Sequence, residues 1–312
     1  MHELAERIQQ RNLRALARAI TLIENDDPDK LDLLSDLFSI QKQAHYIGIT
    51  GSPGAGKSSL VNRMISFLRA QGLTVAVIAV DPTSPFSGGA LLGDRVRMND
   101  HFTDPGVFIR SMATRGSLGG LSRATKDTIR VCDAYGFDVI LVETVGVGQS
   151  ELDIMKVVDT TSVVLTPNSG DVLQIFKAGI MEIADLFIIN KADLPGVRKL
   201  KTQLEEFMMI SHSKGWQAPI VQTVSTENKG IESLWEEMKR HRTYLYETNL
   251  GKEQRKQQLV HEVYELMREE LWQSVEAFVE SDNTKRNQLE DADADPYQMA
   301  KTWLEEWKQG GG

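Results

Sequence analysis

The sequence is poor in the residues that cross-link a protein or hold a metal ion. It contains one cysteine, Cys132, and six histidines that stand far apart along the chain. A single cysteine allows no internal disulfide, and no cysteine or histidine pair has the spacing of a metal site. The sequence therefore predicts a reducing, cytoplasmic setting and no metal bound by a Cys/His cluster.

An excess of positive charge and a long hydrophobic run are also missing. The formal net charge is −9, from 35 Lys and Arg against 44 Asp and Glu, which opposes attraction to the phosphates of nucleic acids. The longest apolar run, "LTVAVIAV" at 73–80, is far shorter than the roughly 20 residues that span a bilayer. The N-terminus carries charges throughout instead of an apolar signal segment. We expect no nucleic-acid partner and no membrane insertion.

The spacing of apolar residues divides the chain into three regions. Residues 1–44 have helical spacing and predict an N-terminal helical extension. Residues 45–240 alternate short apolar runs with helix-length segments, which predicts one α/β domain. Residues 241–312 contain no such runs, and apolar residues at three- and four-residue steps predict a long helix over 252–281. This C-terminal helical arm either packs on the domain or forms a dimer contact.

The apolar runs of the middle region predict a buried sheet. They read "YIGIT", "LTVAVIAV", "VFIRSM", "DVILVET", "TSVVLTP", "DLFIIN" and "PIVQTVS". Strands of this kind, separated by helices, are typical of a parallel sheet that is covered on both faces. The predicted fold class is α/β, with a mostly parallel central sheet, an N-terminal helical extension and a C-terminal helical arm.

The clearest motif follows the first of these runs. In "YIGITGSPGAGKSSL", residues 46–60, a strand leads into Gly-x-x-x-x-Gly-Lys-Ser and then into a helix, which is the context of a phosphate-binding P-loop. The backbone N–H groups surround the phosphates, Lys57 reaches the β- and γ-phosphates, and the Ser58 hydroxyl is a ligand of Mg²⁺. The predicted nucleotide-binding residues of this loop are Gly51, Ser52, Pro53, Gly54, Ala55, Gly56, Lys57, Ser58 and Ser59.

A second motif predicts which base is bound. "LFIINKADLPG" ends a strand in Asn190-Lys191-x-Asp193, where a carboxylate can accept hydrogen bonds from the N1–H and the 2-amino group of guanine. Adenine lacks these donors, and a desolvated Asp193 without them is costly, so GTP is favoured over ATP. In "TVSTENKG", the backbone of Ser225, Thr226 and Glu227 is placed to contact the guanine O6, although Thr226 stands where GTPases usually have Ala.

Three acids are candidates for the γ-phosphate side of the site. Asp81 ends one predicted strand, Glu143 ends another, and Asp94 lies in "GGALLGDRVRM". Ligands of open α/β sheets bind at the carboxyl ends of the strands, so these acids are candidates for contact with Mg²⁺ or its water. The alternative for each is a helix cap or a solvent-facing charge.

Hydrolysis of GTP needs a positioned water and neutralisation of charge more than covalent chemistry. The sequence offers Gln149 or Asp81 to orient the water, and Arg95 or Arg97 to neutralise charge. For either arginine, a solvated face or a structural ion pair is an equally good interpretation.

Taken together, several segments resemble the MeaB/ArgK GTPases, the family of the human methylmalonic aciduria type A protein. The segments are "LTVAVIAVDP", "SPFSGGALLGDRVRM", "VFIRSMATRGSLGGLSRAT", "VETVGVGQSE" and "NKADLPG". The resemblance implies a GTP-hydrolysing, Mg²⁺-dependent chaperone of an adenosylcobalamin-dependent acyl-CoA mutase, which gates cofactor loading and protects the mutase. It also implies a homodimer held through the C-terminal extension.

The segment "GDVLQIFKAG", residues 170–179, resembles the third switch of that family. The resemblance implies that Asp171, Gln174 and Lys177 transmit the nucleotide state to the mutase. The segment departs from the usual pattern, with Asn168-Ser169, Val172 and Ile175-Phe176 where the family has other residues. Methylmalonyl-CoA mutase and isobutyryl-CoA mutase therefore both stay open as partners.

Three other functions fit the sequence less well. A nickel-insertion GTPase needs Cys or His ligands that the sequence does not supply. A kinase of periplasmic binding proteins, the older label of ArgK, needs a base for the acceptor hydroxyl, and no such motif is visible. A partitioning ATPase needs a second Lys early in the P-loop, where Ser52 and Pro53 stand, and leaves Asp193 without a role.

Overall fold

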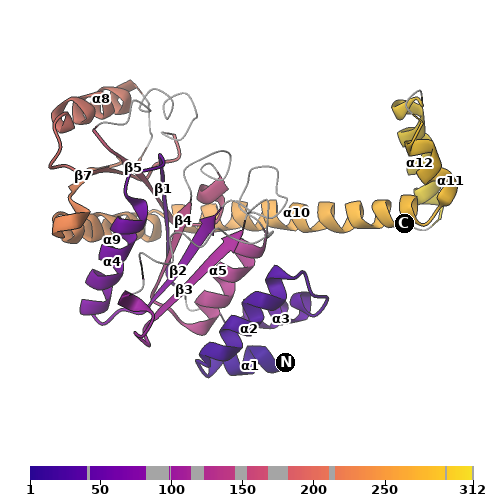
Figure 1. Cartoon of the computed structure of the whole chain (residues 1–312), viewed down its shortest axis with the longest axis horizontal. Helices are drawn as coiled ribbons and strands as arrows, with labels where there is room; N and C mark the ends of the chain where they lie inside the picture. Colours follow the sequence, from indigo (N-terminus) through magenta and orange to yellow (C-terminus); the bar gives the residue numbers. More distant parts are fainter. Residues whose placement is uncertain are drawn as a thin grey trace. The chain divides into compact units, whose positions relative to one another are not determined.

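Figure 1 shows a computed structural model of the chain. It describes residues 1–40, 43–81, 98, 100–113, 123–144, 153–167, 182–210, 215–291 and 294–310. The chain divides into two compact units, Met1–Thr248 and Asn249–Gly312.

In the residues that the structure describes, the first unit is built on a parallel sheet of seven strands in the order β3-β2-β4-β1-β5-β6-β7. Every neighbouring pair in this order is parallel. The strands are β1 (His45–Gly51), β2 (Val75–Asp81), β3 (Val107–Ala113), β4 (Val139–Thr144), β5 (Thr160–Leu165), β6 (Leu186–Asn190) and β7 (Ile220–Thr223). This arrangement confirms the predicted α/β class.

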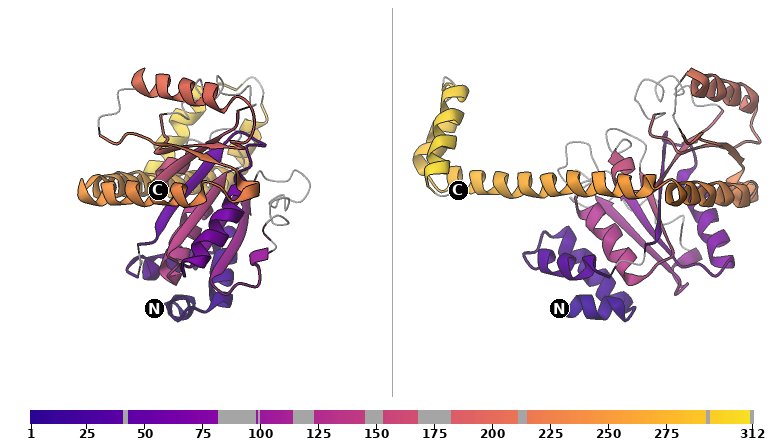
Figure 2. Two further views of the ribbon diagram at one scale, coloured as in Figure 1. Left: turned by 90° about the vertical axis from the view of Figure 1, so that its left-hand side faces the viewer. Right: turned by 180° about the vertical axis from the view of Figure 1, so that it is seen from behind.

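Helices cover both faces of the sheet because successive strand side chains point to opposite sides. In β2, Val75 and Val77 join a core with α4 (Lys57–Ala70) and α9 (Ile231–Glu247), whereas Ala76 and Ile78 join a core on the other face. Figure 2 shows the two layers from further sides. Both strand faces are therefore apolar, which explains the continuous hydrophobic runs in the sequence.

The second core contains the helices at the start of the chain. Its helices are α1 (Glu3–Gln9), α2 (Leu13–Glu24), α3 (Lys30–Phe38) and α5 (Arg123–Tyr135). Buried residues of α2, such as Leu16 and Ile20, share this core with Ile129 of α5. The N-terminal helices thus belong to the first unit. A third core joins β5 and β6 to α8 (Val197–Ile210).

The described residues of the second unit form three helices. They are α10 (Leu250–Glu280), α11 (Asn283–Leu289) and α12 (Pro296–Gln309). Lys285 forms ion pairs with Asp282 and with Glu306 of α12, and Trp307 donates a hydrogen bond to Ser274 of α10. None of the residues described in these helices is buried. Throughout the described part of the chain, every helix is too short or too polar to cross a membrane.

Candidate functional site

The candidate site lies at one edge of the sheet. Because all strands are parallel, their carboxyl ends meet at the same edge, where open α/β sheets bind ligands. The P-loop follows β1, Glu143 and Thr144 end β4, and Asn190 ends β6. The short 3₁₀ helix η3 (Ser225–Glu227) follows β7 at this edge. The topology therefore gathers the motifs that the sequence predicted.

The P-loop backbone requires glycine where it turns. Gly51 has a φ of 134°, and a Cβ there would lie 2.1 Å from the carbonyl oxygen of Val164 in β5. Gly56 has a φ of 88° at the start of α4, and a Cβ there would lie 2.6 Å from the side-chain nitrogen of Asn190. Any side chain at either position is strained by the backbone and by its neighbours.

Lys57 points back into its own loop. Its ammonium donates to the carbonyl oxygens of Gly51 at 2.7 Å and Ser52 at 3.1 Å, and the residue is only 6% exposed. These bonds hold a buried positive charge within the turn that would hold a phosphate. Of the other P-loop residues, Pro53, Gly54 and Ser59 are exposed.

Ser58 and Glu143, two of the predicted Mg²⁺ ligands, lie in direct contact. The Ser58 hydroxyl donates to Glu143 Oε1 at 2.8 Å, and both residues are buried. A hydroxyl and a carboxylate side by side supply the hard oxygen ligands that Mg²⁺ prefers. The described residues contain no group of three or more His, Cys, Asp or Glu that could hold a metal. This donor pair therefore fits an ion that takes its remaining ligands from phosphate and water.

The backbone of Asp81 ends β2 beside β4, with Val80 opposite Thr144 in the ladder. The side chain of Asp81 lies outside the described structure, as do several whole residues predicted for the site. These are Asp94, Arg95, Arg97, Gln149, Asp171, Gln174 and Lys177. Their roles stay predictions.

Asn190 connects the phosphate side of the site with the base side. Its amide nitrogen donates to the carbonyl of Ala55 in the P-loop at 2.9 Å. Its amide oxygen accepts from Thr223 at 3.1 Å and from Ser225 at 2.8 Å. Asn190 is 2% exposed, so this side chain joins the loops around the site. Its predicted contact with the nucleotide itself stays a prediction.

The two other polar residues of this motif are exposed. Lys191, in the left-handed region with a φ of 56°, donates to the carbonyl of Gly54 at 2.9 Å. Asp193 lies in the turn after it, and Ala192 N–H bonds to Thr223 O at 3.0 Å, which fixes this turn to β7. The turn that carries the exposed Asp193 is thus held at the sheet edge beside the end of β7.

The loop after β7, residues 224–229, is fixed by hydrogen bonds within itself and by a hydrogen bond from the P-loop helix α4. Val224 and Lys229 form an isolated backbone bridge, and the Glu227 N–H donates to Val224 O at 3.0 Å. Arg63 of α4 donates from Nε to the carbonyl oxygen of Ser225 at 3.0 Å. Sequence reasoning missed Arg63 and Thr223 because an arginine within a helix and a threonine within a strand carry no motif.

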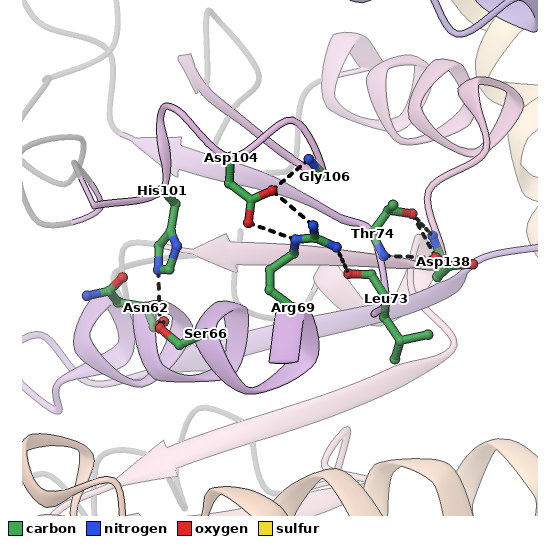
Figure 3. Close-up of polar contacts among 9 residues, drawn as sticks. All are labelled: Asn62, Ser66, Arg69, Leu73, Thr74, His101, Asp104, Gly106 and Asp138. Atoms are coloured by element: carbon green, nitrogen blue, oxygen red, sulfur yellow. Dashed lines mark hydrogen bonds and ion pairs between the residues drawn. The ribbon is translucent and has the colours of Figure 1, made fainter. Parts of the chain in front are cut away.

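The far end of α4 is held by a separate polar cluster, drawn in Figure 3. Arg69 makes two bonds to Asp104, from Nε at 2.9 Å and from a terminal nitrogen at 3.0 Å, and a third to Leu73 O at 2.7 Å. The bond to Asp104 raises the pKa of Arg69, and the same bond lowers the pKa of Asp104. The cluster fixes the P-loop helix to the segment that enters β3.

Comparison with known proteins gives a consistent picture. Residues 16–280 match the family model described as methylmalonyl Co-A mutase-associated GTPase MeaB. A Pyrococcus abyssi protein that is named as a GTPase is 48% identical over 320 residues, covering 99% of this chain and 97% of the relative. The GTPase ArgK of Escherichia coli (strain K12) is 37% identical over 267 residues, covering 83% of this chain and 81% of the relative. A crystal structure of an LAO/AO transport system kinase is similar with a TM-score of 0.73 and 29% identity, covering 97% of this chain and 96% of that one.

Proposed function

Because this chain belongs to the MeaB family of GTPases, we propose that its GTPase activity serves an adenosylcobalamin-dependent acyl-CoA mutase. In this proposal the protein gates loading of the cofactor and protects the mutase from inactivation. Methylmalonyl-CoA mutase is the first candidate partner, because the family description names it, and isobutyryl-CoA mutase is the second. The cytoplasmic location expected from the sequence is part of the same proposal.

One observation carries the nucleotide site: Asn190 bonds both to the P-loop and to the loop that begins at Ser225. A P-loop alone binds phosphates of any nucleotide. Its rigid connection to the loop beside Asp193 sets the distance between the phosphates and the base. The geometry therefore suits a guanine nucleotide bound in one position, as the GTPase family requires.

The residues around the phosphates divide the work of hydrolysis. The Lys57 ammonium, which bonds to the carbonyl oxygens of Gly51 and Ser52 in this structure, contacts the β- and γ-phosphates when the nucleotide binds. Ser58 and Glu143 would hold Mg²⁺. When bound, the ion would supply neutralisation of the negative charge on the transferred group. Asp81, Asp94 and Gln149 remain candidates for completing the metal shell and orienting the attacking water.

The second unit supports the proposed homodimer. Residues of α10 at steps of three and four, Val260, Val263, Met267 and Leu271, are between 44% and 55% exposed. A helix stripe of this kind is a surface that a partner helix covers. We propose that a second copy of the chain covers it. The switch residues Asp171, Gln174 and Lys177 are proposed to contact the mutase.

The test is GTP turnover by the purified protein, with and without one equivalent of methylmalonyl-CoA mutase. Gel filtration of the mixture with a non-hydrolysable GTP analogue reports complex formation. We expect a stable complex and faster turnover. Lys57→Ala, which removes the phosphate contact, abolishes tight GTP binding and the complex, whereas Lys199→Ala, an exposed lysine of α8, changes neither.

Two negative results are distinguishable. Normal GTP affinity in Lys57→Ala contradicts the nucleotide site. No complex and no stimulation, with normal turnover of the protein alone, rules out this mutase, and the same assay with isobutyryl-CoA mutase then decides whether the chaperone proposal stands.

A further inference from the structure

Arg63 lies on the P-loop helix but bonds to the opposite side of the site. It is six residues after Lys57 in α4, and its Nε–H donates to the carbonyl oxygen of Ser225 at 3.0 Å. Arg63 is half-buried. The P-loop helix therefore contacts directly the first residue of η3, which the sequence places against the guanine O6.

Ser225 is held at both its side chain and its carbonyl. Its hydroxyl donates to Asn190 Oδ1 at 2.8 Å, and its carbonyl oxygen accepts from Arg63. The residue is 5% exposed. Two bonds from two different elements fix both the position of Ser225 and the rotation of the peptide plane that follows it.

That peptide plane also contains the N–H of Thr226. In a trans peptide the C=O and the N–H point to opposite sides, so an arginine that holds the oxygen also sets the direction of the N–H. The Glu227 N–H already bonds to Val224 O at 3.0 Å. In the described part of the chain, no group accepts a hydrogen bond from the Thr226 N–H. This donor is therefore available to a ligand, and the bond from Arg63 to the Ser225 carbonyl oxygen sets its direction.

We propose that Arg63 is a positioning residue for guanine recognition, which holds the Ser225–Thr226 peptide so that the Thr226 N–H faces O6 of the base. The inference rests on the proposed nucleotide site and adds a residue to it. Two groups then read two edges of guanine separately. Asp193 reads N1–H and the 2-amino group, and the peptide that Arg63 orients reads O6.

Two analogues of GDP separate these edges. IDP lacks the 2-amino group and reports the contact with Asp193. 6-Thio-GDP keeps that group but replaces O6 with sulfur, a poor acceptor, and reports the contact with the Thr226 N–H. Diphosphates are used because they are not consumed during a calorimetric titration.

The variant is Arg63→Met, which removes the donor and keeps most of the side-chain length. The matched control is Arg198→Met, which removes an exposed arginine of α8. We expect the wild type and the control to prefer GDP over 6-thio-GDP by roughly tenfold, in line with one positioned hydrogen bond. In Arg63→Met this preference falls to about twofold or less, while the preference of GDP over IDP is retained. Arg63→Lys, which keeps a donor, restores part of the lost preference.

Each other outcome overturns the inference in a recognisable way. An unchanged preference for GDP over 6-thio-GDP in a folded Arg63→Met shows that Arg63 does not set the O6 contact. An equal loss of both preferences shows that Arg63 supports the whole site instead of one contact. A wild type without preference for GDP over either analogue removes the guanine site itself, and the inference with it.

Discussion

Asp185 and His241, outside the nucleotide site, have opposite pKa shifts although they lie in contact. His241 Nε2 lies 3.4 Å from Asp185 Oδ1, and its Nδ1 lies 2.9 Å from the Thr160 hydroxyl. Burial lowers the pKa of His241 to about 4, and burial raises the pKa of Asp185 to about 7 even though 30% of its side chain is exposed. Both groups are therefore neutral in the folded protein at mildly acidic pH.

The two shifts change stability with pH in opposite directions. Between about pH 4 and 7 the folded state keeps a proton on Asp185 that the unfolded chain has lost, so stability falls as pH rises. Between about pH 4 and 6.5 the unfolded chain holds a proton on His241 that the folded state lacks, so stability rises with pH. In the wild type the two effects largely cancel.

Removing one partner exposes the effect of the other. We expect the free energy of unfolding of Asp185→Asn to rise between pH 4.5 and 6.5, by up to about 1.4 kcal/mol per pH unit for one proton. We expect that of His241→Asn to fall over the same interval. Urea titrations of both variants and the wild type at three pH values measure the slopes. Slopes of the same sign in the two variants contradict the assignment of these pKa shifts.

At the scale of elements, the fixing of α4 by Arg69 and Asp104 gives the clearest prediction. Arg69→Met removes a two-bond ion pair and the contact with Leu73, and we expect the free energy of unfolding to fall by about 1–2 kcal/mol because the pair is partly exposed. We expect Asp104→Asn to lower the free energy of unfolding less in the Arg69→Met background than in the wild type, because the ion pair is already lost. Denaturant unfolding measures both. Arg198→Met is the control for loss of positive charge. If the losses of stability caused by Arg69→Met and Asp104→Asn add fully in the double variant, the two residues are not directly coupled.

The sequence predicted the strands better than the contacts between elements. Each of the seven strands overlaps one of the predicted runs. The run is most continuously apolar in β2 and β6, which lie inside the sheet, because a parallel strand covered on both faces needs apolar side chains on both. The P-loop and Asn190–Asp193 were found because each motif is contiguous in the sequence. Arg69 and Asp104 are separated by 35 residues, and in the sequence each resembles a solvated surface charge. Such pairs depend on how helices and strands pack, which spacing does not encode.

At the scale of the whole molecule, the two units differ in how far their side chains are buried. The first unit contains the buried cores, whereas the described helices of the second contain no buried residue. On α10, Tyr264 is 68% and Trp272 is 62% exposed. Large apolar side chains gathered along one helix are a typical binding surface. This contrast supports the proposal that the second unit forms the dimer contact.

The proposed dimer is tested by charging the apolar stripe of α10. We expect Met267→Asp combined with Leu271→Asp to convert the proposed dimer into a monomer, because each copy then brings two carboxylates to the interface, where they lack partners and oppose association. Sedimentation velocity measures the mass. Gln273→Asp is the control, since it lies about 200° around the helix from Leu271 and adds a carboxylate away from the stripe.

GTP turnover of the double variant without mutase is expected to stay at the wild-type level, because the residues proposed for hydrolysis lie in the first unit. A double variant of unchanged mass shows that another surface holds the dimer, and a wild type that sediments as a monomer shows that the stripe has a different partner.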